Sequence, residues 1–183
     1  MTLNKLCGSG MHTAILGHDQ IKAGSADVVI AGGMESMTNA PHMVMGARGG
    51  VGTGAQTLED HMFKDALWSE ASNRLMGCYA QDIADELNIT REDMDEYAIA
   101  SLTRAKTAIE DGTLDDEVVP VTIKTRRGET QVTQDEQPMT ASLDKIPNLR
   151  PAFKKDGTVT AANSSSISDL SLIHISEPTR RYF

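Results

Sequence analysis

The chain has 183 residues, enough for one ordinary domain or for a small domain plus part of another. Its 17 Lys and Arg residues against 26 Asp and Glu residues give a net charge of −9, and only 4% of its residues are aromatic. An acidic chain repels a phosphate backbone and offers few rings for base stacking, so we expect no nucleic-acid binding. No stretch approaches the roughly 20 apolar residues that span a bilayer, and the N-terminus lacks a signal-peptide pattern. We therefore expect no membrane association.

The two cysteines, Cys7 and Cys78, are too few for a disulfide scaffold or a metal-binding quartet. Free cysteines are typical of a reducing compartment, where a thiol either fills space or does chemistry. The composition therefore predicts a cytoplasmic protein without a metal site.

The first thirty residues predict an extended run, a turn, a helix and a strand. Residues 2–6 form the extended run and residues 7–10 the turn, while residues 11–23 carry an apolar helical face that Gly24 ends. Residues 26–31 (ADVVIA) are almost continuously apolar, which favours a parallel strand buried on both faces. Together these elements predict a β-α-β unit with a right-handed crossover, and hence an α/β fold.

Further elements are predicted along the rest of the chain. The glycine-rich stretch 46–54 indicates a loop. Two helices are expected at about 73–87 and 91–111, the second capped by Thr90 and ended by Gly112. The expected remainder is a hairpin with strands at 117–125 and 129–133, a polar loop to residue 146, and extended segments at 149–153 and 158–162.

Cys7 has the setting that most strongly suggests chemistry. It is predicted to lie between an extended run and a helix, next to Gly8 and Gly10, and such glycines permit close approach of a substrate. N–H groups at a helix start favour a thiolate and can hold an oxyanion. The alternative is a small, inert cysteine buried at a tight turn. The spacing alone leaves both interpretations open.

Two sequence blocks resemble thiolases, the acetyl-CoA acetyltransferase family. The first block consists of Asn4, CGSG at 7–10 and AGGMESMT at 31–38. The second consists of LRPAF at 149–153, GTVTA at 157–161, and Asn163, Ser165 and Asp169. The resemblance implies a partial thiolase fold, in which residues 1–36 belong to the N-terminal core domain and residues 37–167 form an α+β loop domain that contacts coenzyme A.

The resemblance also implies an activity. Cys7 would be the nucleophile that takes an acyl group from an acyl-CoA thioester, and a second acetyl-CoA would then attack that acyl group in a reversible Claisen condensation. No cofactor would be permanently bound, since coenzyme A enters as part of the substrate. The full-length protein would act in fatty acid metabolism as a homodimer or homotetramer.

Residues along coenzyme A are implied in the same way, and they are Met76, Leu149, Ala152, Phe153, Ala161 and Ser165. Leu75 departs from the family, because many biosynthetic thiolases carry histidine at this position. The departure removes a polar group and leaves the acyl chain length open.

The resemblance covers residues 1–169, less than half of a full thiolase. Residues 170–183 depart abruptly, and 170–180 resemble the translation of a transposase-type sequencing adapter, so we treat this tail as non-native. The family's histidine base and second cysteine come from later segments, so we expect the fragment alone to be inactive. Two alternatives stay open: a non-catalytic truncated subunit or interaction module, and a condensing enzyme of the ketoacyl synthase type.

Overall fold

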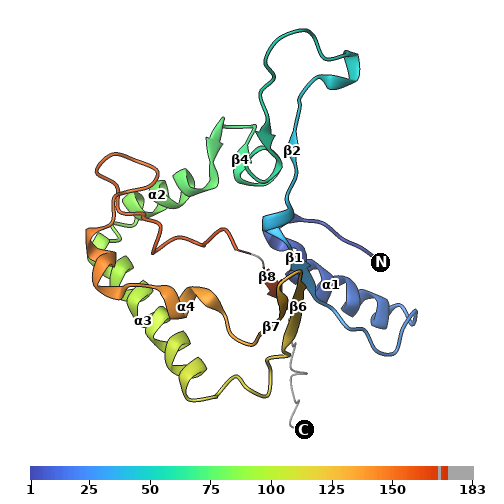
Figure 1. The fold of residues 1–183 in the computed structure, drawn as a ribbon, viewed down its shortest axis with the longest axis vertical. Helices are drawn as coiled ribbons and strands as arrows, with labels where there is room; N and C mark the ends of the chain where they lie inside the picture. The colour runs from blue at the N-terminus through green and yellow to red at the C-terminus, as the bar shows by residue number, and fades with distance from the viewer. Residues whose placement is uncertain (169, 173–183) are drawn as a thin grey trace. The chain divides into compact units, whose positions relative to one another are not determined.

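The computed structural model describes residues 1–168 and 170–172 (Figure 1). The described residues divide into two compact units, one formed by 1–75 with 167–168 and 170–172, and one formed by Met76–Ser166. The domain limits expected from the sequence, 1–36 and 37–167, stay a prediction. Residue 169 and the greater part of the predicted non-native tail, 173–183, lie outside the described residues.

The first unit contains the expected helix, α1 (Ser9–Lys22). It begins two residues earlier than predicted and is followed by Gly24, whose φ of +69° lies in the left-handed region. Glycine adopts this conformation without a steric penalty, so the predicted helix stop is confirmed. The chain turns here, and the Ser25 N–H donates to the Gln20 carbonyl at 2.9 Å.

The apolar run 26–31 is not a strand in the structure, so that prediction is wrong, and residues 2–6 form none either. Val29 packs on α1 at Gly17, where a Cβ atom would lie 2.9 Å from Val29 Cγ1. Val28 and Ile30 are 83% and 95% exposed. A strand needs a partner for its backbone hydrogen bonds, and the described residues place none beside this run. The apolar composition of this run is typical of a strand that is buried on both faces. In the structure only the face that carries Val29 is packed, and the other face is exposed.

All strand pairs among the described residues are antiparallel, so the parallel pairing expected for the β-α-β unit does not form there. In the first unit, β1 (Gly33–Glu35) pairs with β8 (Leu170–Leu172), β2 (His42–Met43) with β3 (Glu59–Asp60), and β4 (Trp68–Ser69) with β5 (Arg74–Leu75). Short helical turns at Met37–Asn39, Ala47–Gly49 and Phe63–Leu67 lie between them. Gly46, Gly50 and Gly54 all have positive φ, which confirms the glycine-rich loop.

The second unit is built on two helices, α2 (Met76–Glu86) and α3 (Arg91–Glu110). The predicted cap of α3 is confirmed, since the Asp93 N–H donates to Thr90 Oγ1 at 3.1 Å. The Asp93 carboxylate accepts the Thr90 N–H in return at 3.4 Å, which completes a capping box. Gly112, with φ of +75°, follows the helix as expected.

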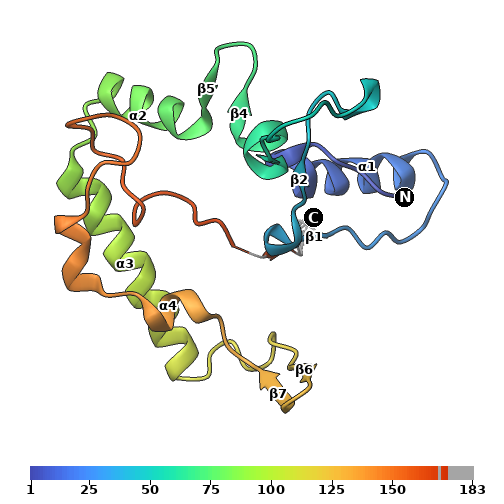
Figure 2. The ribbon, with the colours of Figure 1, turned by 45° about the horizontal axis from the view of Figure 1, so that its top comes forward.

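The predicted hairpin is confirmed with shorter strands, β6 (Val121–Thr125) and β7 (Gly128–Val132). The register sets Val121 opposite Val132 and Thr125 opposite Gly128, so Arg126 and Arg127 form the turn. Every residue of both strands is exposed, and Figure 2 shows the hairpin extending beyond the end of α3.

The segment after the hairpin is more ordered than predicted. The expected polar loop contains a short helix, α4 (Glu136–Thr140), and a 3-10 turn, Leu143–Asn148. Both pack on α3. The extended segments 149–153 and 158–162 form no strands, although the Ala152 N–H donates to the Val159 carbonyl at 2.9 Å. The buried apolar residues of this unit are Ala84, Ala98, Ile146 and Val159.

Candidate functional site

Cys7 lies in a single 3-10 turn, Leu6–Gly8, that leads directly into α1. Asn4 Oδ1 accepts the Leu6 N–H at 2.9 Å. Ser9 Oγ accepts the Lys5 N–H at 2.7 Å and donates to the Leu6 carbonyl at 2.8 Å. The side chains of Asn4 and Ser9 therefore hold the turn from both sides, which gives a physical reason for these residue types beside the cysteine.

Leu6, the residue before the cysteine, has φ of +52°. This conformation costs a non-glycine residue roughly 1–2 kcal/mol, and it persists only where surrounding bonds enforce it. The Asn4 and Ser9 bonds supply that enforcement. As a result, Cys7 stands at the start of α1 with an exposed, free thiol. The structure therefore does not bury Cys7, and its role as a nucleophile stays a prediction.

The arrangement around Cys7 suits a nucleophile. N–H groups in the first turn of a helix have no carbonyl partner within the helix and attract anions. An exposed thiol placed there can attack a carbonyl carbon while nearby donors stabilise the oxyanion. Among the described residues, no group of three His, Cys, Asp or Glu side chains is arranged to hold a metal ion.

The residues expected along coenzyme A all belong to the second unit, while Cys7 belongs to the first. Met76 opens α2 and is 41% exposed. The exposed residues of the expected set are Ala152, Ala161 and Ser165, and the half-buried ones are Leu149 and Phe153. The structure thus leaves Ala161 and Ser165 accessible to a ligand.

The start of α2 and the LRPAF segment are brought together by one contact. The Phe153 ring lies directly on the backbone of Gly77, so closely that a Cβ atom at Gly77 would overlap the ring. This contact sets Phe153 beside the residue that follows Met76. The structure thus brings Phe153 against position 77, which directly follows Met76 in the chain.

Gln81 is a central residue that sequence reasoning missed. Its side chain is 1% exposed. Its Oε1 accepts the N–H groups of Thr158 and Val159 at 2.9 and 3.0 Å. Its Nε2 donates to Asp85 Oδ1 at 2.8 Å and to Thr158 Oγ1 at 3.1 Å. The available signal was its position four residues from both Gly77 and Asp85, on one face of the helix.

A second polar chain supports the same loop from α3. Asn163 Oδ1 accepts the Thr160 N–H at 2.7 Å, and its Nδ2 donates to Asp95 Oδ1 at 3.1 Å. Asp95 is only 5% exposed, and its other oxygen accepts Arg91 Nε at 2.6 Å. Arg91 also donates to the Ile146 carbonyl at 2.9 Å. The buried carboxylate is thus paired and fully hydrogen-bonded, as a buried charge requires.

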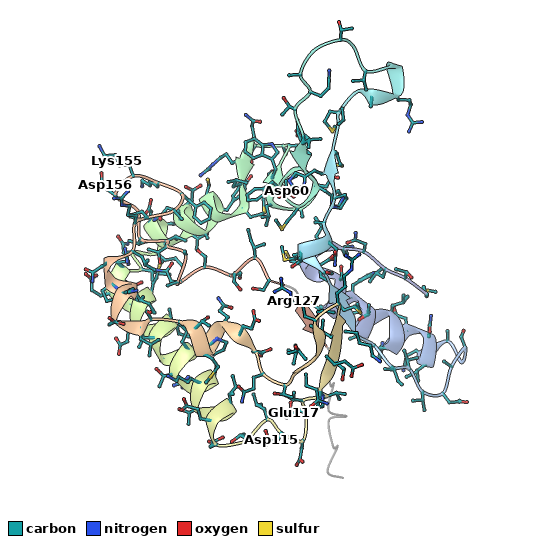
Figure 3. The ribbon with its side chains drawn as sticks, viewed as in Figure 1. Asp60, Asp115, Glu117, Arg127, Lys155 and Asp156 are labelled. Atoms are coloured by element: carbon teal, nitrogen blue, oxygen red, sulfur yellow. The ribbon has the colours of Figure 1, made fainter. Side chains whose placement is uncertain are left out.

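An exposed ion pair completes the attachment of the loop. Lys154 Nζ lies 2.5 Å from Asp85 Oδ2. The hydrogen bond from Lys154, helped by the one from Gln81, lowers the pKa of Asp85, and the bond to Asp85 raises the pKa of Lys154. Figure 3 shows the next residues, Lys155 and Asp156, at the outer tip of the loop.

The comparisons with known proteins agree on one family. The family model for the N-terminal domain of thiolase matches residues 1–172. Acetyl-CoA acetyltransferases from Yarrowia lipolytica and Rhizobium meliloti are each 46% identical over 168 residues. These stretches cover 92% and 91% of this chain but 42% of each relative.

Solved structures give the same result. An acetyl-CoA acetyltransferase from Syntrophomonas wolfei superposes with a TM-score of 0.82 at 38% identity, over 90% of this chain and 42% of that one. Human mitochondrial 3-ketoacyl-CoA thiolase gives 0.78 at 38% identity, over 87% of this chain and 41% of that one. The chain belongs to the thiolase family, with a partial α/β thiolase fold, and it spans less than half the length of these relatives.

One further finding concerns membranes. No helix among the described residues is long and apolar enough to cross a bilayer.

Proposed function

We propose that this chain is part of a thiolase-type acyltransferase in which Cys7 accepts an acyl group from a coenzyme A thioester. The observation that carries the proposal is the turn of Cys7, where Asn4 and Ser9 hold an exposed thiol at the start of α1. The relatives named acetyl-CoA acetyltransferase support this substrate class.

The reaction begins when the thiolate of Cys7 attacks the thioester carbonyl. A carbon–sulfur bond forms to Cys7, the bond to the sulfur of coenzyme A breaks, and the departing thiolate takes up a proton. The N–H of Cys7 helps to hold the oxyanion of the intermediate. In the second step, the α-carbon of an acetyl-CoA loses a proton and attacks the acyl group on Cys7. A carbon–carbon bond forms, the carbon–sulfur bond to Cys7 breaks, and the released Cys7 thiolate takes up a proton, which leaves a 3-ketoacyl-CoA.

The second unit binds coenzyme A through the residues that the resemblance assigns to it. Met76, the LRPAF segment and Ala161 lie along it, and Ser165 contacts its pantetheine arm. The exposure of Ala161 and Ser165 beside a buried polar network supports this role. The complete protein would be a homodimer or homotetramer acting on acyl-CoA in the cytoplasm, without a permanently bound cofactor.

Acetylation of the purified chain tests this proposal. With acetyl-CoA, we expect a single acetyl group on Cys7, none on Cys78, and no formation of acetoacetyl-CoA, because the chain covers 42% of its relatives. Peptide mass mapping locates the label, and the Cys7→Ser variant is the negative control. Labelling of both cysteines alike would refute a special role for Cys7, and multiple turnovers would refute the inactivity of the fragment.

A second candidate, a non-catalytic subunit or interaction module, is favoured by the exposed apolar residues Val28 and Ile30. Contiguous exposed apolar patches mark contacts with other chains, and these two residues lie close together in one apolar run. Copurification with a co-expressed full-length acetyl-CoA acetyltransferase, lost in the Val28→Thr, Ile30→Thr variant, would support it. The family match provides no support for the ketoacyl synthase alternative.

A further inference from the structure

One face of α2 contacts the segment that runs from Phe153 to Thr160. Gly77, Gln81 and Asp85 follow one another at intervals of four residues, which places them on the same side of a helix. Gly77 receives the Phe153 ring, Gln81 binds the backbone at Thr158 and Val159, and Asp85 pairs with Lys154. Of these three contacts, the one at Gln81 is fully buried.

The Gln81 side chain binds two backbone groups of this segment at once. Thr158 and Val159 are consecutive residues, and both of their N–H groups donate to the single Gln81 Oε1. Consecutive N–H groups of a strand point to opposite sides, so Gln81 holds this backbone in a bent conformation that belongs to no sheet. Gly157 makes room for this contact, because a Cβ atom there would lie 2.5 Å from Gln81 Oε1 and 3.0 Å from the Lys154 carbonyl.

Further hydrogen bonds fix the backbone between Thr158 and the residues that are expected to contact coenzyme A. Thr160 is fully buried, its N–H donates to Asn163, and its carbonyl accepts Ser164 Oγ at 2.6 Å. Ala161 and Ser165 lie next to these anchored residues and are exposed. The base of the loop is thus fixed while its outer positions remain open, as a preorganised binding loop requires.

We propose that Gln81 is a positioning residue for coenzyme A, which it does not touch. Its side-chain amide fixes the backbone at 158–159, and that backbone sets Ala161 and Ser165 in place before the ligand arrives. This inference rests on the proposed function, since Ala161 and Ser165 are the expected contacts of coenzyme A.

The test compares coenzyme A binding by the whole chain and its variants, measured by isothermal titration calorimetry. Gln81→Met keeps the length of the side chain but removes its acceptor and donor, and we expect a weakening of the Kd by about tenfold or more, equivalent to about 1.4 kcal/mol. Gln131→Met is the matched control, because Gln131 lies on the exposed strand β7. It should leave the Kd unchanged.

Two further variants separate positioning from general stability. Thr90→Ala removes the cap of α3 and lowers stability without touching the loop, so it should leave the Kd unchanged. The double variant Gln81→Glu, Asp85→Asn keeps an acceptor for both N–H groups and reverses the bond between positions 81 and 85. Because Asp85→Asn also removes the ion pair with Lys154, we expect the double variant to bind as tightly as Asp85→Asn alone and more tightly than Gln81→Met.

Hydrogen exchange provides a readout without the ligand. The amides of Thr158 and Val159 should exchange at least tenfold faster in Gln81→Met than in the wild type, and those of α3 should not change. If wild-type chain binds coenzyme A and Gln81→Met binds it equally well, the inference is wrong while the proposed function stands. If the wild-type chain does not bind coenzyme A, the proposed ligand contacts are wrong and the inference falls with them.

Discussion

The contact between Gly77 and Phe153 makes a prediction in which two opposing effects are compared. Gly77→Ala should stabilise α2 by up to about 1 kcal/mol, because alanine has a higher helix propensity than glycine. However, the new methyl group would occupy the space of the Phe153 ring, which must move out of its half-buried site. Overpacking of this kind costs about 1–3 kcal/mol. We expect the cost to prevail and the free energy of unfolding to fall by about 1–2 kcal/mol.

The effect of Gly77→Ala on the free energy of unfolding should change sign when the Phe153 ring is removed. A Phe153→Ala background removes the ring atoms that the methyl group would overlap, so Gly77→Ala should stabilise the second unit by up to about 1 kcal/mol. The two positions are therefore coupled by about 2–3 kcal/mol in a double-mutant cycle. An equal cost of Gly77→Ala in both backgrounds would refute the packing argument.

Urea denaturation followed by far-UV circular dichroism is the suitable assay, because α2 and α3 of the second unit contain more helical residues than α1 of the first. Tryptophan fluorescence would instead follow the first unit, since the single tryptophan of the chain is Trp68. Gly52→Ala serves as the control, because a Cβ atom at Gly52 meets nothing within 4 Å. It should change the stability of the second unit by less than about 0.5 kcal/mol.

Two other predictions concern charged groups of the second unit. Asp95→Ala should lower the free energy of unfolding by about 3 kcal/mol, because it leaves Arg91 and Asn163 without their buried acceptor. Glu96→Ala, at the exposed neighbouring position, should be close to neutral, and a loss below about 1 kcal/mol for Asp95→Ala would contradict the reasoning. The lowered pKa of Asp85 predicts that its pair with Lys154 stabilises the loop above the ordinary carboxyl value of 3.8 and ceases to do so as the pH falls through the lowered pKa. The difference in melting temperature between wild type and Asp85→Asn should therefore shrink in acid and in high salt, whereas a difference independent of pH would show that the ion pair contributes nothing.

Local signals in the sequence predicted those parts of the fold that depend on neighbouring residues. The cap at Thr90 and the stops at Gly24 and Gly112 act within one or two helical turns, so α1 and α3 were found within two residues of their limits. The turn at Cys7 was also predicted, because glycines and short polar side chains govern backbone conformation locally. By contrast, the apolar run 26–31 predicted a strand, whose formation depends on a partner elsewhere in space.

The sequence by itself determined the family, the three longer helices, the hairpin and the candidate nucleophile, since these follow from local propensity or from motifs of adjacent residues. Only the tertiary structure decided that Gln81 supports the loop at 158–159. It also decided that Asn163, Asp95 and Arg91 are linked by consecutive hydrogen bonds. These partners lie 77 and 68 residues apart in the two key bonds. From the sequence alone, a glutamine or an aspartate on a helix is expected to be exposed, and only the fold shows that Gln81 and Asp95 are buried. Once they are buried, each of their polar atoms requires a hydrogen-bond partner.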